Sequence, residues 1–189
     1  DGRTDAFSAQ AMGVTAENVA DKYSVSRSEQ DLFALSSQKK AAMARDLGEF
    51  KEEIISVEAG GKKLGTDECI RETSMEKLSS LKPSFKEGGS VTAGNSSPFS
   101  DGAAALVLCR EDLAKDLRLS ALARIDCFAE VGFDPSLMGY SPALSMQKLS
   151  AKGGFSLSDI DLFEINEAFA SQSVAVIRDL GLEEEKVNA

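Results

Sequence analysis

The chain has 189 residues, of which 42% are apolar and 28% charged, and its formal net charge is −10. This composition is typical of a globular protein with a core, which excludes a disordered or fibrous chain. The acidic balance argues against nucleic-acid binding, and the longest apolar run, residues 103–109, is far shorter than the ~20 residues of a membrane span.

Cysteine and histidine usage narrows the possible chemistry. Cys69, Cys109 and Cys127 show no CxxC spacing and cannot all pair, which favours a reducing, intracellular compartment over a secreted disulfide scaffold. The chain has no histidine. This excludes Ser-His and Cys-His nucleophiles within it and most zinc sites, so we expect no metal site.

The first third of the chain predicts two helices and a strand. Apolar residues at helical spacing indicate a short helix over 14–24. Ser26 and Glu29 have the S-x-x-E spacing of a capping box, which opens a second helix that ends at Gly48. The pattern over 53–58 favours a strand with a Gly-Gly turn after it.

The rest of the chain predicts strands that alternate with helices. In order, the pattern predicts a helical turn over 75–81, a strand buried on both faces over 103–109, a helix over 111–117, a strand over 121–131, a helix over 142–151, a short strand over 160–165 and a helix over 167–180. Because strand and helix alternate through the second half, we expect an α/β fold with a layered sheet.

The segment 159–172, DIDLFEINEAFASQ, places Asn166 at a corner between a predicted strand and a predicted helix. Ligands gather at such corners, because helix N-termini there present free N–H groups. Asn166 could cap the helix, which its residue type favours, or it could direct its amide toward a developing oxyanion or a water. Glu167 is expected to stabilise the helix dipole rather than to act as a base.

The segment 88–102, GGSVTAGNSSPFSDG, is too long and too rich in Gly, Ser and Asn for a simple hairpin turn. It is either an ordered surface loop or a loop whose backbone approaches a ligand closely, as glycine permits. Its spacing matches neither the P-loop nor the G-x-G-x-x-G fingerprint, so it predicts no nucleotide motif.

The sequence resembles the thiolases in four strings that follow the family's order and spacing. They are MGVTAENVA at 12–20, SRSEQDLFALSSQKKA at 26–41, VTAGNSSPFSDGAAAL at 91–106 and NEAFA at 166–170. The sequence is most similar to the degradative 3-ketoacyl-CoA thiolases. Ala11 points to the same branch, since biosynthetic members carry His at that place.

The resemblance implies the acetyl-CoA acyltransferase reaction of fatty-acid β-oxidation. An acyl group passes from 3-ketoacyl-CoA to coenzyme A as a carbon–carbon bond is cleaved; coenzyme A is a substrate, and no cofactor is implied. Family members use an early Cys nucleophile, a His in a GHP motif and a second Cys in a CxG motif, and none of these motifs occurs here. We therefore expect an internal fragment, about half of a thiolase, which is inactive by itself.

The family fold consists of two similar βαβαβαββ halves, with a loop domain inserted in the first. By the resemblance, residues 1–97 are most of this loop domain, residues 98–119 end the N-terminal half, and residues 120–189 begin the C-terminal half. The expected fold class is thus a partial, thiolase-like layered α/β fold.

The resemblance also assigns residues to the ligand. The positions that match family contacts to coenzyme A are Met12, Arg71, Phe85, Ala93, Gly94, Ser97, Phe99, Met138, Ala168 and Phe169. Asn166 matches the family residue that positions a water at the thioester oxyanion.

Two functional hypotheses stay open at this point. The chain is either part of a catalytic thiolase or a non-catalytic module, derived from a thiolase, that binds coenzyme A or serves in assembly. The implied partners are acyl-CoA, coenzyme A and further copies in a homodimer or homotetramer. The resemblance favours a peroxisome or mitochondrion over the cytosol.

Overall fold

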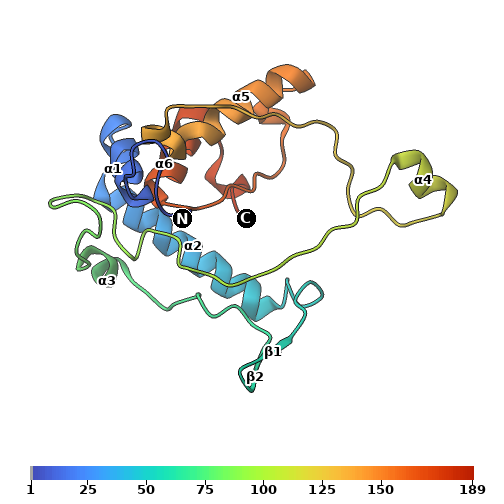
Figure 1. The fold of residues 1–189 in the computed structure, drawn as a ribbon, viewed down its shortest axis with the longest axis horizontal. Coiled ribbons are helices and arrows are strands. Elements are labelled where there is room, and N and C mark those ends of the chain that lie inside the picture. The colour runs from blue at the N-terminus through green and yellow to red at the C-terminus, as the bar shows by residue number, and fades with distance from the viewer. Residues whose placement is uncertain (1) are drawn as a thin grey trace.

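The computed structural model describes residues 2–189, and Figure 1 shows the N-terminal helices lying beside the last long helix. In chain order the elements are α1 (Met12–Lys22), α2 (Arg27–Leu47), β1 (Val57–Ala59), β2 (Lys62–Leu64), α3 (Met75–Ser79), α4 (Glu111–Asp116), η1 (Pro135–Tyr140), α5 (Ser141–Gly153), η2 (Leu157–Asp159), α6 (Ala170–Leu180) and η3 (Glu184–Lys186). Within residues 2–189, every helix is too short or too polar to span a bilayer.

The first two helices confirm the local signals of the sequence. The predicted capping box of α2 is present: Glu29 N donates to the Ser26 hydroxyl, and Ser26 N donates to the Glu29 carboxylate at 2.7 Å. Gly48 ends the helix in the left-handed conformation, with φ at 76°, which glycine adopts without strain. The helix expected over 14–24 is present as α1, two residues earlier.

The apolar core lies where α1, α5 and α6 meet η1, and α2 packs against α6 beside it. Its members include Val19, Ala143 and Val176, which have no exposed surface. At the edge of this core Tyr23 stacks on Tyr140, with ring centroids 4.1 Å apart. Burial of a side chain the size of valine stabilises a fold by roughly 1.5–3 kcal/mol, so this cluster holds the helices together.

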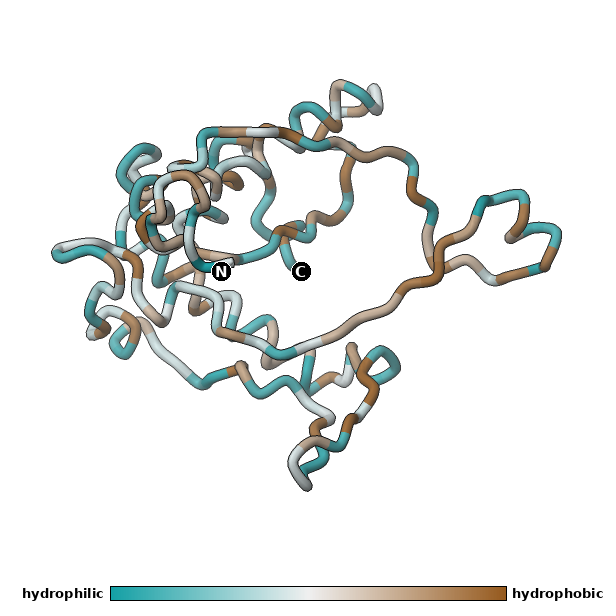
Figure 2. The backbone as a smooth tube through the Cα atoms, in the orientation of Figure 1, coloured by the Kyte–Doolittle hydropathy of each residue, from teal (hydrophilic) through white to brown (hydrophobic). Residues whose placement is uncertain are grey.

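The strands predicted over 103–109 and 121–131 are wrong for the described structure. Together with α4, these segments form an extended arm, residues 99–132, that leaves the packed helices and returns along α5 (Figure 1). On the return, Lys148 and Lys152 of α5 donate to the Glu130 and Phe128 carbonyls at 2.8 and 2.9 Å. Val107 and Leu122 are each 98% exposed, and Figure 2 shows brown, apolar stretches of the arm before and after the more polar α4. A strand buried on both faces needs neighbours that cover it, and residues 2–189 place none there.

Two other strand predictions are met in part. The strand expected over 53–58 shares only residues 57 and 58 with the observed β1, which pairs antiparallel with β2 in the register Val57↔Leu64. The Gly60–Gly61 turn joins them as predicted, with both glycines at positive φ. In place of the strand over 160–165 there is a single parallel bridge, between Phe163 and Val187.

The remaining helices are present with small shifts at their ends. The predicted helices over 75–81, 111–117 and 142–151 correspond to α3, α4 and α5. The helix expected from residue 167 begins only at Ala170, so α6 is three residues shorter than predicted at its start. This late start bears directly on Asn166.

Candidate functional site

The Gly- and Ser-rich segment 88–97, called the cavity loop from here on, is hydrogen-bonded to the residues before α6. Ser97 N donates to the Ala168 carbonyl at 3.0 Å, and Ala170 N donates to the Asn95 carbonyl at 2.9 Å. Two of the four strings quoted above, far apart in the sequence, therefore form one continuous wall.

A cavity of about 1060 Å³ lies between this wall, α1 and the segment around α3. All ten positions that the sequence assigns to coenzyme A line it: Met12, Arg71, Phe85, Ala93, Gly94, Ser97, Phe99, Met138, Ala168 and Phe169. Its size is at the upper end of ordinary ligand pockets, which suits a long ligand. The structure brings the ten residues together, and their contact with coenzyme A stays a prediction.

Aromatic rings form the apolar side of the cavity. Phe85 and Phe169 meet edge to face, with ring centroids 6.1 Å apart and ring planes at 86°. The Phe85 ring lies directly on the backbone of α1 at Gly13, where any Cβ would clash with it. Gly13 therefore allows the close approach that holds Phe85 in the cavity wall.

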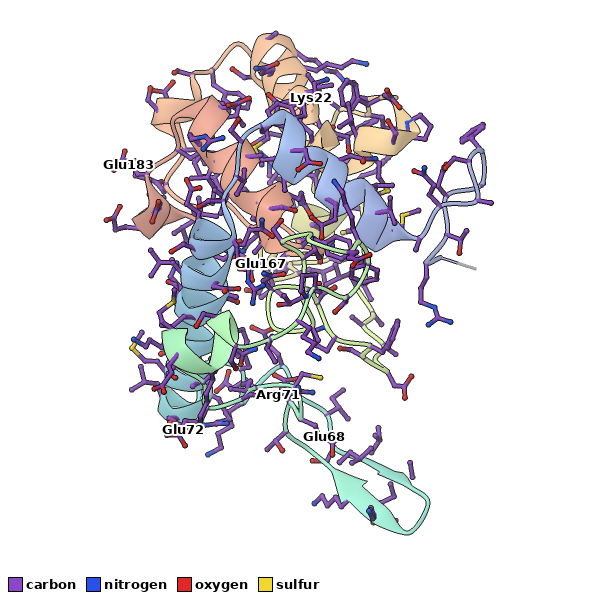
Figure 3. All side chains as sticks on the ribbon, turned by 90° about the vertical axis from the view of Figure 1, so that its left-hand side faces the viewer. Lys22, Glu68, Arg71, Glu72, Glu167 and Glu183 are labelled. Carbon is purple, nitrogen blue, oxygen red and sulfur yellow. The ribbon has the colours of Figure 1, made fainter. Side chains whose placement is uncertain are left out.

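Two arginines bring positive charge to the cavity. Figure 3 shows Arg71 on the segment between the β-hairpin and α3. Its backbone N–H donates to Gln38 Oε1 of α2 at 2.7 Å, which ties this segment to the helix. The guanidinium of Arg3 lies over the Phe99 ring, 5.0 Å from its centre. Guanidinium groups are well suited to phosphate oxygens, because they donate several hydrogen bonds in a fixed geometry.

Sequence reasoning missed several residues of this cavity. They are Arg3, Gln38, Cys69, Leu78, Leu81 and Gln172. Leu78 and Leu81 pack on Gly94 so closely that a Cβ there would lie 2.6–2.7 Å from their methyl groups. These residues belong to separate parts of the chain. Gln38 lies in the string at 26–41 and Gln172 ends the segment 159–172, yet no local signal marks any of the six as a cavity residue, so the fold is needed to bring them to one place.

Asn166 is exposed and lies outside the residues that line the cavity. Its interpretation as a helix cap is wrong, because α6 begins at Ala170 with Phe169 in the N-cap position. The Asn166 carbonyl accepts a hydrogen bond from Gln172 Nε2 at 3.0 Å. Among residues 2–189 no partner is found for its side-chain amide, so the alternative role as an N–H donor stays a prediction.

Glu167 does not act on a helix dipole, since it precedes α6 by three residues. Its Oε1 accepts a hydrogen bond from Asn188 Nδ2 at 2.7 Å, and Asn188 Nδ2 also donates to the Ile165 carbonyl at 2.9 Å. Glu167 therefore links the segment before α6 to the last residues of the chain.

Comparison with protein families identifies the chain. Residues 1–112 match the thiolase N-terminal domain, and residues 119–189 match the thiolase C-terminal domain. The chain belongs to the thiolase family.

Individual thiolases agree with this assignment. A probable acetyl-CoA acyltransferase of Staphylococcus aureus (strain COL) is 50% identical over 194 residues, which cover 100% of this chain and 49% of that protein. The crystal structure of the Bacillus anthracis acetyl-CoA acetyltransferase superposes with a TM-score of 0.94 at 43% identity, covering 98% of this chain and 48% of the other. Human mitochondrial 3-ketoacyl-CoA thiolase in complex with CoA gives 0.94 at 42% identity, covering 99% and 48%.

These superpositions confirm the expected fold class, a partial thiolase-like α/β fold. The chain spans about half the length of the curated relatives it matches. Since the superposition on the Bacillus anthracis enzyme covers 98% of the chain, the extended arm follows the backbone path of that enzyme even though it forms no strand among the described residues.

The expectation of a peroxisome or mitochondrion is wrong. The Staphylococcus and Bacillus relatives come from bacteria, which have neither organelle. These relatives favour the cytosol over both.

Proposed function

We propose that this chain forms the coenzyme A-binding part of a 3-ketoacyl-CoA thiolase, which cleaves 3-ketoacyl-CoA with coenzyme A in fatty-acid β-oxidation. The observation that carries the proposal is the convergence of all ten assigned residues on one cavity. A structural neighbour whose crystal structure contains CoA supports the same class of ligand.

The walls of the cavity match the chemistry of the three parts of coenzyme A. Its phosphates carry several negative charges, and Arg71 is the one cation among the ten assigned residues that line the cavity. Its adenine ring and pantetheine arm need apolar surface, which Met12, Met138 and Phe85 provide. The Gly- and Ser-containing cavity loop lets the backbone approach the arm.

In this proposal the chain binds the substrate and other parts of the enzyme supply the nucleophile and the base. Acyl transfer from a thioester needs a thiolate and a group that moves its proton. The chain contains no histidine, and of its three cysteines Cys69 alone is among the residues that line the cavity. Asn166 would contribute an N–H toward the thioester oxygen through a bound water.

The absence of histidine also favours a second candidate, a non-catalytic module that binds coenzyme A or serves in assembly. The coding sequence on both sides of Asp1 and Ala189 distinguishes the two. A Cys-containing thiolase segment upstream with GHP and CxG motifs downstream supports the catalytic enzyme, and stop codons support the module. In either case we propose a homodimer or homotetramer, as in the family, with acyl-CoA as the further ligand of the catalytic form.

Calorimetric titration of the purified chain with coenzyme A, ATP and NAD tests the binding site. We expect coenzyme A to bind most tightly, and Arg71→Ala to weaken its binding roughly 10- to 100-fold, because a charge-assisted hydrogen bond to a phosphate contributes about 1.5–3 kcal/mol. Lys62→Ala, which removes an exposed cation of the β-hairpin, is the matched control and should leave the affinity unchanged. Preference for NAD would contradict the assignment.

The same purified chain can be assayed for thiolase turnover, which tests whether it lacks a catalytic nucleophile. Acetoacetyl-CoA and coenzyme A should give no turnover above background, since no cysteine of the chain has a histidine to activate it. Turnover that persists through repurification would show that this chain carries a nucleophile of its own.

A further inference from the structure

A buried carboxylate on α1 holds the cavity loop in place through hydrogen bonds. Glu17 of α1 is 1% exposed, and its carboxylate accepts hydrogen bonds from Ser90 N at 2.9 Å, Val91 N at 2.8 Å and Ser90 Oγ at 3.1 Å. Gly89 is needed beside it, because a Cβ at that position would lie 2.7 Å from Glu17 Cδ. The charge of Glu17 is thus solvated by the donors of the loop instead of by water.

A second buried side chain, Gln30 of α2, reaches the same point of the loop. It has no exposed surface, and its Nε2 donates to Ser90 Oγ at 2.9 Å and to the Val25 carbonyl at 3.2 Å. The Ser90 hydroxyl accepts from Gln30 and donates to Glu17, so it joins both helices to the loop.

The far end of the loop is fixed through Asn95. Its Oδ1 accepts from Thr92 N at 2.8 Å, and its Nδ2 donates to Asp31 Oδ1 at 3.0 Å. Asp31 is 1% exposed and is held by Arg27, whose Nε lies 2.7 Å from its Oδ2. The loop between Ser90 and Asn95 is therefore tied at both ends to side chains buried in the helices.

We propose that Glu17 is a positioning residue for ligand binding: its ionised carboxylate sets the shape of the cavity loop, and thereby places Ala93 and Gly94 against the ligand. Neither residue has a side chain that could adjust to the ligand, so their backbone must already be in place. A loop already fixed in one conformation avoids the entropic cost of ordering its backbone when the ligand binds.

Charge, and not shape alone, is what this position requires. Both Glu17 oxygens receive N–H or O–H donors from the loop. A glutamine of the same shape has one accepting oxygen, and its amide N–H₂ would face a backbone N–H, which leaves a buried donor without an acceptor. The role of Glu17 in ligand binding rests on the proposed function, whereas its role in ordering the loop does not.

Native-state hydrogen exchange of Glu17→Gln tests the ordering of the loop. We expect the amides of Ser90 and Val91 to exchange roughly 10- to 100-fold faster than in the wild type, because hydrogen bonds to a charged group are lost. Val176→Ala is the control: it destabilises the core and should accelerate all core amides together without singling out the loop. Unchanged protection of Ser90 and Val91 in Glu17→Gln would overturn the proposal.

Coenzyme A affinity tests the consequence for the ligand. At a temperature where both variants are folded, Glu17→Gln should weaken binding about tenfold or more, while Val176→Ala should leave it unchanged. Lost protection with unchanged affinity overturns the positioning role. If the wild type binds no coenzyme A, the proposed function fails, and the exchange experiment still decides whether Glu17 orders the loop.

A milder variant covers the case in which Glu17→Gln does not fold. Ser90→Ala removes only the hydroxyl that joins Glu17 and Gln30, and the backbone donors to Glu17 remain. We expect a smaller acceleration of exchange at Val91 and a smaller loss of affinity, about 3- to 10-fold. Wild-type exchange and affinity in this variant would contradict a network that acts through the Ser90 hydroxyl.

Discussion

The packed helices α1, α2, α5 and α6, called the packed part from here on, and the extended arm contain similar apolar residues. Many of these residues are buried in the packed part, and most are exposed in the arm. In the packed part α1 and α2 both contact α6, and Val176 has no exposed surface. In the arm Leu108 is 73% exposed and Phe128 is 68% exposed. The difference lies in the neighbours: a helix satisfies its own backbone and needs one packing partner, whereas a central strand needs partners along both edges and on its faces.

The packed part, with the loops tied to it, holds the residues assigned to ligand binding, whereas the arm holds the segments that would need sheet partners. Apart from Phe99, which begins the arm, the residues assigned to coenzyme A come from the packed part and the loops tied to it. The buried contacts of Glu17 and Asp31 fix the cavity loop without any contribution from the arm. Binding should therefore depend on the packed part, while catalysis requires more of the thiolase.

The largest expected effect is the loss of turnover on replacing Asn166. This replacement tests whether the packed part contributes a catalytic group in addition to binding the ligand. In a full-length thiolase that contains this chain, Asn166→Asp cannot donate an N–H and adds negative charge where negative charge develops. Loss of such a donor costs about 100- to 1,000-fold in turnover, or roughly 3–4 kcal/mol. Turnover and the thermal midpoint of unfolding should be measured together, since we expect the midpoint to stay near its original value.

Glu167→Gln is the matched control for this experiment. It removes a neighbouring charge and keeps an oxygen that can accept from Asn188, so its turnover should stay close to that of the unaltered enzyme. Near-normal turnover in Asn166→Asp would remove the only catalytic assignment in this chain.

A smaller effect is expected when a buried valine and an exposed valine are each replaced by alanine and the losses in stability are compared. Val176→Ala in the packed part should lower the free energy of unfolding by roughly 2–3 kcal/mol, because it removes buried methyl groups and leaves a cavity. Val107→Ala in the arm should change it by less than about 0.5 kcal/mol, since that side chain is 98% exposed. Urea unfolding of the purified chain measures both, and equal losses would show that the arm is packed in solution.

The sequence predicted well the elements whose signals are local. The capping box at Ser26, the end of α2 at Gly48 and the Gly60–Gly61 turn each depend on a few neighbouring residues, and all three are present. The strands over 103–109 and 121–131 were predicted from apolar patterns, which record that a segment suits a core and not which neighbours cover it. Those neighbours are absent from the described residues.

The residues of the candidate site also fall into those that the sequence predicts and those that only the fold reveals. The ten ligand positions were assigned by resemblance to the thiolases, and the structure brings them together because two of the quoted strings form one wall. The sequence does not single out Gln38, Leu81 and Gln172 as cavity residues, although Gln38 and Gln172 stand inside quoted segments, because nothing local shows which way their side chains face. The cap assigned to Asn166 failed because the chain stays non-helical from Asn166 to Phe169, and Phe169 itself is the N-cap of α6, which residue preference alone does not indicate.

The smallest expected effect is on the stability that one hydrogen bond of Tyr140 gives the packed part. Tyr140 is 8% exposed, and its hydroxyl donates to Asp179 Oδ2 at 2.9 Å. Burial, followed by this hydrogen bond, raises the pKa of Tyr140 to about 12. Because the folded state holds the phenol proton more tightly than the unfolded chain, this contribution to stability is complete below pH ~10 and is lost as the pH rises toward 12.

Tyr140→Phe should therefore lower the free energy of unfolding by about 1 kcal/mol at pH 8, the value of one hydrogen bond. It should also flatten the fall in stability between pH 10 and 12, because the phenol that titrates there is gone. Urea unfolding at pH 8, 10 and 11 measures both effects. Tyr23→Phe keeps the ring stack and the bond to Asp179, so it should stay near wild-type stability at pH 8. An alkaline slope in Tyr140→Phe as steep as that of the wild type would show that other groups cause the loss, and that the rim of the packed part does not depend on this contact.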